Sequence, residues 1–232
     1  LDSLVLAGAK APVSFFAYPE KPSVLAPDKA KKTVLADADM DVVDALTRLA
    51  NVLEAPNQPA VITEATQYPL VDGAIDASEL GKVIANQLPD NAIVCDEGAT
   101  NGLGAFLLTA NAAPHDWLTL TGGAIGQGLP LAIGAAIACP NQKVLALEAD
   151  GSGMYTVQAL WTMVREALDI TVMLLNNGSY AILNIELQRV GVQEPGPTAL
   201  SLLDLTNPEI NWTDIAQGMG MQATRVTTVA SL

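Results

Sequence analysis

The sequence is poor in the residues on which several classes of protein depend. It has one histidine, His115, and two cysteines, Cys95 and Cys139, whose spacing is not that of a metal site. Basic residues are scarce: 11 Lys and Arg stand against 25 Asp and Glu, which gives a formal net charge of −14. So acidic a chain is a poor partner for nucleic acid or for an anionic membrane. We therefore expect neither as a partner, and no centre built on His or Cys ligands.

Longer features are missing too. No apolar run reaches the roughly 18 residues of a membrane span, and the first residues lack the pattern of a signal peptide. Two cysteines without metal spacing suit a reducing compartment, so we expect a cytoplasmic protein with free thiols. The chain opens at Leu1 without Met, inside an apolar run, and ends soon after another, so we expect a fragment of a longer protein.

The clearest pattern lies between residues 143 and 187. One apolar run, residues 143–148, ends at Ala149-Asp150-Gly151, and a second, residues 170–175, ends at Asn176-Asn177-Gly178. Short runs closed by turn residues are typical of buried parallel strands. Between them, apolar residues at helical spacing predict a single crossover helix with one apolar face: Val157, Leu160, Trp161, Val164 and Leu168. Asp150 and Asn177 should then lie at the carboxyl ends of two parallel strands, where α/β sheets bind ligands.

The residue types at these strand ends indicate a particular chemistry. A carboxylate and a side-chain amide oxygen are hard ligands suited to Mg²⁺ or Ca²⁺. Gly151, Ser152 and Gly153 offer backbone N–H groups at a helix start, where phosphates bind. Together they predict a diphosphate held through a divalent ion. The alternative is a βαβ unit with an incidental Asp and Asn, because DG and NN are also common turn dipeptides.

Asp150-Gly151, followed after residues 152–175 by Asn176-Asn177, resembles the motif of thiamine-diphosphate-dependent enzymes. In that family the Asp, the second Asn and a backbone carbonyl two residues later hold Mg²⁺, which implies Asp150, Asn177 and Ser179 here. The family's first Gly is replaced by Ala149, which bears on how closely the turn approaches the diphosphate. The resemblance also implies that six residues of these two turns contact the cofactor: Gly151, Ser152, Asn177, Ser179, Tyr180 and Ala181. Two of them, Asn177 and Ser179, are also the implied metal ligands.

A glycine-rich turn precedes this segment, in the sequence TGGAIGQGLPLAIGAA from Thr121 onward. It is not a dinucleotide fingerprint, because Leu131 stands where the third glycine would fall, and this disfavours a nicotinamide-binding domain. It resembles a segment of acetolactate synthase and benzoylformate decarboxylase. The resemblance implies that Ile125 supports the bent cofactor and that the carbonyl of Gly123 meets its 4′-amino group. The alternative is a turn that only packs a helix against the sheet.

A looser match follows the first strand of the same region. By position, Ala99 and Thr100 would contact the far end of the diphosphate, although a surface turn is an alternative. The glutamate that activates the pyrimidine ring lies in the family's amino-terminal domain, so we expect no catalytic residue in this chain. His115 is expected in a loop, without a catalytic role.

The order of elements predicts an α/β fold with a doubly wound parallel sheet, the thiamine-diphosphate-binding fold, after the end of a Rossmann-like central domain. Residues 1–56 would be that remnant, with strands at 3–7 and 33–36 and a helix at 41–53; residues 57–75 would be a linker. Residues 76–232 would be the cofactor domain, opening with a capping box at Asp76. The expected strands are 92–95, 117–120, 143–148, 170–175 and 222–226, and the further helices are 103–108, 131–138 and 214–219.

The resemblance implies a thiamine-diphosphate- and Mg²⁺-dependent lyase or transferase that decarboxylates a 2-oxo acid and ligates the product, as acetolactate synthase does. A benzoylformate-type decarboxylase and a non-catalytic subunit of the same fold are the alternatives. A homodimer or homotetramer is expected for the full-length protein. Four residues after Asn177 would line the substrate side or, equally, form a helix packing face: Tyr180, Ile182, Leu183 and Leu187.

Residues 1–232 alone should show no decarboxylase or carboligase activity, because the activating glutamate is expected outside them. The measurement is pyruvate consumption by the purified chain with thiamine diphosphate and Mg²⁺. Turnover above that of a blank without protein would contradict this expectation.

Overall fold

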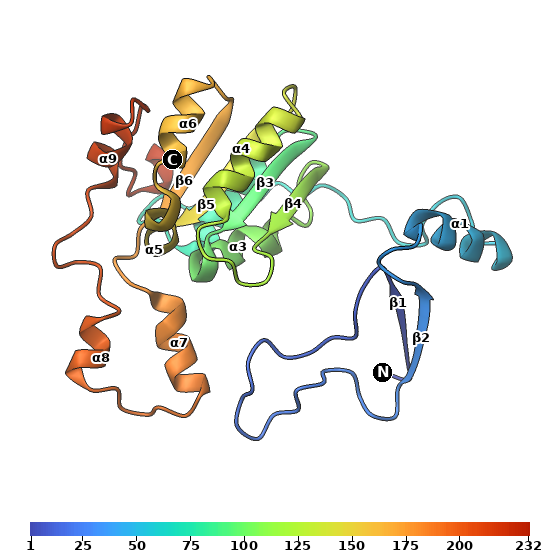
Figure 1. Cartoon of the computed structure of the whole chain (residues 1–232). Helices are drawn as coiled ribbons and strands as arrows, with labels where there is room; N and C mark the ends of the chain where they lie inside the picture. The colour runs from blue at the N-terminus through green and yellow to red at the C-terminus, as the bar shows by residue number, and fades with distance from the viewer. The chain divides into compact units, whose positions relative to one another are not determined.

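The computed structural model describes all 232 residues and divides the chain into two compact units (Figure 1). The first comprises Leu1–Ile62 with Glu186–Gln193, and the second comprises Thr63–Ile185 with Glu194–Leu232. The boundary after Ile62 falls inside residues 57–75, the expected linker, which contain no helix or strand. The inclusion of residues 186–193 in the first unit was not foreseen.

The first unit is a small strand–strand–helix arrangement. Strands β1 (Ser3–Ala7) and β2 (Lys31–Ala36) pair in parallel, and helix α1 (Val42–Val52) follows. Asp41 caps α1, because its side chain accepts the N–H of Asp44 at 2.9 Å. These elements confirm the three predictions for this part of the chain, with small shifts at their ends.

The second unit is built on a four-stranded parallel sheet in the order β4-β3-β5-β6. Its strands are β3 (Ala92–Glu97), β4 (His115–Thr119), β5 (Val144–Ala149) and β6 (Ile170–Leu175). The main helices are α2 (Ala77–Gln87), α3 (Ala99–Thr109), α4 (Gly128–Ala138) and α6 (Ala159–Arg165). Shorter elements complete the unit: α5 (Asp150–Gly153), η1 (Met154–Thr156), α7 (Ala181–Arg189), which runs into the first unit, α8 (Pro197–Ser201), α9 (Trp212–Gly218) and η2 (Val229–Ser231).

Helices cover both faces of this sheet (Figure 1). Alternate strand residues point to opposite faces, so Ile93 and Cys95 pack with α4 and α6, while Ala92 and Val94 pack with α2 and α3. The predicted α/β fold with a doubly wound parallel sheet is therefore confirmed. None of its helices combines the length and apolar character that crossing a bilayer requires.

The crossover between β5 and β6 differs from the prediction of one helix. It is divided into α5, η1 and α6, and the buried residues of α6 are Ala159, Leu160 and Met163. Trp161 and Val164, expected on the buried face, are 50% and 39% exposed. The buried face of α6 is therefore narrower than the spacing predicts, although Val157 and Leu168 do pack against the core. Two glycines in the first turn favour the broken start of the crossover.

Three smaller predictions are wrong. His115 begins β4 instead of lying in a loop, because it pairs with Ala92 of the neighbouring strand. Residues 222–226 form no strand. They and β6 line one cavity of about 1230 Å³, and the two segments do not pair through a ladder of backbone hydrogen bonds. Asp76 does cap α2, but the capping box is incomplete, since Glu79 bonds to Lys82 and to the N–H of Val71.

Helices α2 and α3 touch through glycines. A Cβ on Gly104 would lie 2.2 Å from the carbonyl oxygen of Ala77, and one on Gly81 would lie 2.6 Å from the carbonyl oxygen of Gly104. Such distances are too short for any side chain, so the packing of these two helices requires both glycines.

Gly104→Ala should lower the free energy of unfolding by about 1–3 kcal/mol, because the backbone of α2 cannot yield easily to the added methyl group. Gly134→Ala is the matched control: it also lies inside a helix, but nothing lies within 4 Å of its added Cβ. The control should raise stability by about 0.5–1 kcal/mol through helix propensity alone. Urea unfolding of both variants checks this, and a change of the same sign in both would contradict it.

Candidate functional site

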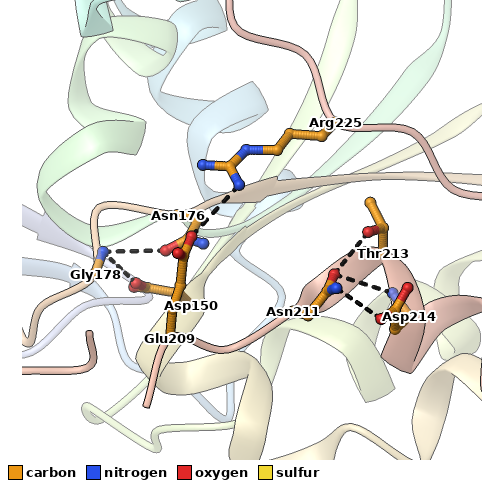
Figure 2. A network of polar contacts seen from close by, with 8 residues as sticks. All are labelled: Asp150, Asn176, Gly178, Glu209, Asn211, Thr213, Asp214 and Arg225. Carbon is orange, nitrogen blue, oxygen red and sulfur yellow. Dashed lines mark hydrogen bonds and ion pairs between the residues drawn. The ribbon is translucent and has the colours of Figure 1, made fainter. Parts of the chain in front are cut away.

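The carboxylate of Asp150 joins the ends of two neighbouring strands. Asp150 follows β5 directly and is 1% exposed. Its Oδ1 accepts the N–H of Gly151 at 3.0 Å, and its Oδ2 accepts the N–H of Gly178, which follows β6, at 2.7 Å (Figure 2). The same N–H of Gly178 also reaches Oδ1 of Asn176 at 3.0 Å. The two halves of the predicted motif are thus brought into direct contact.

The turn after β6 is held firmly by its own hydrogen bonds. Oδ1 of Asn177 accepts the N–H of Ser179 at 2.9 Å, and the hydroxyl of Ser179 donates to the carbonyl oxygen of Leu203 at 3.1 Å. The N–H of Tyr180 donates to the same carbonyl oxygen at 2.9 Å. Gly178, with φ of +67°, makes the left-handed bend that this turn needs.

These residues fit a hard divalent cation by the chemistry of their donors. Asp150, Asn177 and the carbonyl of Ser179 supply oxygen ligands from one turn and the facing strand end, and each oxygen that already accepts a hydrogen bond retains a second lone pair. No group of three or more His, Cys, Asp or Glu side chains is placed to hold a metal. A cation here would therefore rely on one carboxylate with amide and carbonyl oxygens, as Mg²⁺ sites do.

The residues that would meet a diphosphate are also close by. Gly151 lies under the ring of Tyr180, since a Cβ on Gly151 would be 2.4 Å from Cε1 of that ring. The hydroxyl of Ser152 donates to Glu148 and, at 3.2 Å, to the carbonyl oxygen of Ala149. The one hydrogen of this hydroxyl is therefore used within the chain, which leaves the backbone N–H of Ser152 as its donor to a ligand. Ala181, also expected at the cofactor, begins α7.

The glycine-rich turn leads into α4 and has an unusual backbone. Gly122, Gly123 and Gly126 have φ of +63°, +67° and +89°, which an L side chain rarely adopts. Ile125 is 54% exposed, so its side chain is not part of the core of this chain. The hydroxyl of Thr156 donates to the carbonyl oxygen of Gly126 at 2.9 Å, which places this turn against the segment that follows Asp150–Gly153.

Ala99 and Thr100 lie in the first turn of α3, not in a surface loop. Ala99 has φ of +48°, a strained value for a residue with a side chain, and such strain gathers at functional positions. A cleft of about 290 Å³ opens beside it, lined by Asp96, Glu97, Ala99, Leu103, Phe106, Thr119 and Leu120. A Cβ on Gly98 would be 3.1 Å from Leu175, so this turn adjoins the end of β6.

The cavity beside β6 reaches the same strand ends. Its lining includes Asn176, Asn177 and Asn101, together with Arg225. Arg225 forms an exposed ion pair with Glu209 at 3.4 Å (Figure 2). In the same view the side chain of Asn211 caps α9. Polar groups therefore line the cavity that the turn after β6 adjoins.

Two buried glutamates were missed from the sequence. Glu97 is the last residue of β3 and Glu148 the last but one of β5; the two are paired in the sheet register and are 4% and 0% exposed. Burial raises the pKa of Glu148 to about 8. The hydrogen bond from the Ser152 hydroxyl lowers this pKa, and the nearby Glu97 carboxylate raises it further. The N–H of Leu129 also lowers this pKa slightly, but Oε2 of Glu148 has no partner with hydrogen-bond geometry. The signal available was an acidic residue at the end of each apolar run.

Comparison with known proteins agrees with this geometry. Residues 96–232 match the family model described as thiamine pyrophosphate enzyme, C-terminal TPP binding domain. Over 226 residues the chain is 50% identical to a candidate acetolactate synthase large subunit, IlvX, of Mycobacterium tuberculosis, covering 97% of this chain and 44% of that protein. The large subunit of acetolactate synthase isozyme 1 of Escherichia coli is 31% identical over 192 residues, covering 78% of this chain and 33% of that protein.

Solved structures show the same fold. A thiamine diphosphate-dependent 4-hydroxybenzoylformate decarboxylase of Rhodococcus jostii superposes with a TM-score of 0.77 at 23% identity, covering 99% of this chain and 44% of that one. The chain spans less than half the length of each of these relatives. On the match of its residues 96–232, the chain belongs to the thiamine pyrophosphate enzyme family and carries that family's C-terminal cofactor-binding domain.

Proposed function

We propose that the full-length protein is a thiamine-diphosphate- and Mg²⁺-dependent enzyme that decarboxylates a 2-oxo acid and ligates the product, in the manner of acetolactate synthase. The observation that carries the proposal is the 2.7 Å hydrogen bond between Gly178 and Asp150, which unites both halves of the motif. The acetolactate synthase names of two relatives support this reaction over a simple decarboxylation. We also propose a cytoplasmic homodimer or homotetramer.

The residues divide the work of holding the cofactor. Asp150, Asn177 and the carbonyl of Ser179 would hold Mg²⁺, and the first-turn N–H groups of α5 and α3 would face the diphosphate. When bound, thiamine diphosphate supplies the electron sink that decarboxylation of a 2-oxo acid needs. Gly123 and Ile125 would orient its pyrimidine end, and no acid or base of this chain is required at the reacting carbon.

The substrate side is assigned to the start of α7. No residue of α7 is buried, and Ile182 and Leu183 are 41% and 42% exposed, which favours lining a site over forming a packing face. The product formed from pyruvate distinguishes this enzyme from its two alternatives. The proposed enzyme forms a ligated 2-hydroxy-2-methyl-3-oxo acid, whereas a benzoylformate-type decarboxylase releases a free aldehyde. A non-catalytic subunit forms neither product.

Asp150→Ala should weaken Mg²⁺-dependent binding of thiamine diphosphate at least about tenfold, or roughly 1.4 kcal/mol, because the only anionic ligand is lost. The measurement is calorimetry on the full-length protein. Asp169→Ala is the control, since its ion pair with Lys143 is exposed and such pairs contribute little. Unchanged affinity in Asp150→Ala would refute the metal assignment.

Ile125→Ala should lower the turnover number much more than it weakens cofactor binding, because the metal and diphosphate contacts stay intact. Its stability should change by less than about 1 kcal/mol, since the side chain is 54% exposed and leaves no buried cavity. Melting temperature, cofactor affinity and single-turnover rate are measured on one preparation. A normal rate, or a rate that falls only in step with cofactor affinity, would remove Ile125 from the site.

A further inference from the structure

We propose that Glu97 is a positioning residue: it fixes the glycine-rich turn, residues 121–128, in the shape that receives the pyrimidine end of the cofactor. The inference rests on the proposed function and deepens it. Glu97 lies at the end of β3 and belongs neither to the metal ligands nor to the diphosphate contacts. Its action on the cofactor is through the backbone of the turn.

Both carboxylate oxygens of Glu97 are used by this turn. Oε1 accepts the N–H of Gly126 at 2.6 Å, and Oε2 accepts the N–H of Gly128 at 2.5 Å. The side chain is 4% exposed, and no Lys or Arg pairs with it. Burying a carboxylate is costly unless hydrogen bonds compensate, so these two N–H groups are its main support.

The turn is held from a second side as well. The carbonyl oxygen of Gly126 accepts the hydroxyl of Thr156 at 2.9 Å, so both polar backbone groups of Gly126 are bound by side chains from other elements. A Cβ on Gly126 would lie 2.7 Å from Cβ of Tyr155, so the turn packs closely against the segment that contains Tyr155 and Thr156. Ile125 precedes Gly126, and its N–H donates to the carbonyl oxygen of Gly123 at 3.0 Å. Fixing Gly126 therefore fixes Ile125 and Gly123, the two residues assigned to the pyrimidine end.

A carboxylate suits this task better than any other side chain of its size. Glutamine has one acceptor oxygen, so its amide NH₂ would face one of the two backbone N–H groups, donor against donor. A Cβ at residue 128 would lie 2.8 Å from Cβ of Glu97 and 2.3 Å from Oε2 of Glu148, so only glycine lets the turn come this close. Burying the carboxyl group of Glu97 costs more free energy than burying an apolar side chain would, which indicates that Glu97 has a role in the shape of the turn.

The test compares two ligands in the full-length protein, thiamine diphosphate and inorganic pyrophosphate, each with Mg²⁺, by calorimetry. Glu97→Gln should weaken the binding of thiamine diphosphate roughly tenfold or more, because loss of one hydrogen bond to the turn displaces Gly123 and Ile125 together, whereas Ile125→Ala leaves the Gly123 contact in place. Pyrophosphate, which lacks the pyrimidine, should change by less than about threefold. Glu79→Gln is the matched control: this Glu also accepts a backbone N–H, from Val71, but lies on α2 away from the turn, and it should alter neither affinity.

Thr156→Val is a second variant, which tests the inference if Glu97→Gln fails to fold. It removes the second support of Gly126 and should give the same selective loss. Equal weakening of both ligands, or no weakening of either, in the variant that folds would overturn the inference. Failure of the unaltered protein to bind thiamine diphosphate would instead overturn the proposed function, and the inference with it.

Discussion

The site depends on the carboxylate of Asp150, which accepts N–H groups from its own strand end and from the turn after the neighbouring strand. A parallel sheet places the ends of β5 and β6 at the same edge, but it does not by itself make the two turns meet. The buried carboxylate of Asp150 brings the two turns together, because the N–H of Gly178 donates to it at 2.7 Å and would lose this close partner if the turns separated. Once the turns are joined, Asn177 and Ser179 are fixed beside Asp150, and the turn after β6 and the end of β5 together present three oxygen ligands.

The rest of the site is supported by close backbone contacts at glycines and by buried carboxylates. Gly151 admits the ring of Tyr180, Gly126 admits Tyr155, and Gly128 admits the paired Glu97 and Glu148. Each contact would be blocked by a single methyl group. The result is a group of turns whose shape is fixed before any ligand arrives, so that little ordering has to be paid for on binding. Preorganisation of this kind suits a cofactor that must be held in one conformation.

Much of this arrangement could be predicted from the sequence. The apolar runs that became β3, β5 and β6 were short and closed by turn residues, and the pair of turns at Asp150 and Asn177 followed from the rule for parallel strand ends. The broken crossover could not be predicted, because the spacing of apolar residues alone does not show where a helix is interrupted. Residues 222–226 have the composition of a strand but no partner in register. Glu97 and Glu148 were missed because their importance lies in tertiary contacts of residues that look like ordinary strand ends.

The central claim is that the joined turns bind a diphosphate through a divalent cation. The most direct measurement is a calorimetric titration of the full-length protein with thiamine diphosphate, once with Mg²⁺ and once with a chelator. The account predicts saturable binding that requires Mg²⁺, because the carboxylate, amide and carbonyl oxygens of the joined turns would repel the diphosphate unless a cation lay between them. Binding of equal strength in the chelator, or no binding in either condition, would contradict it.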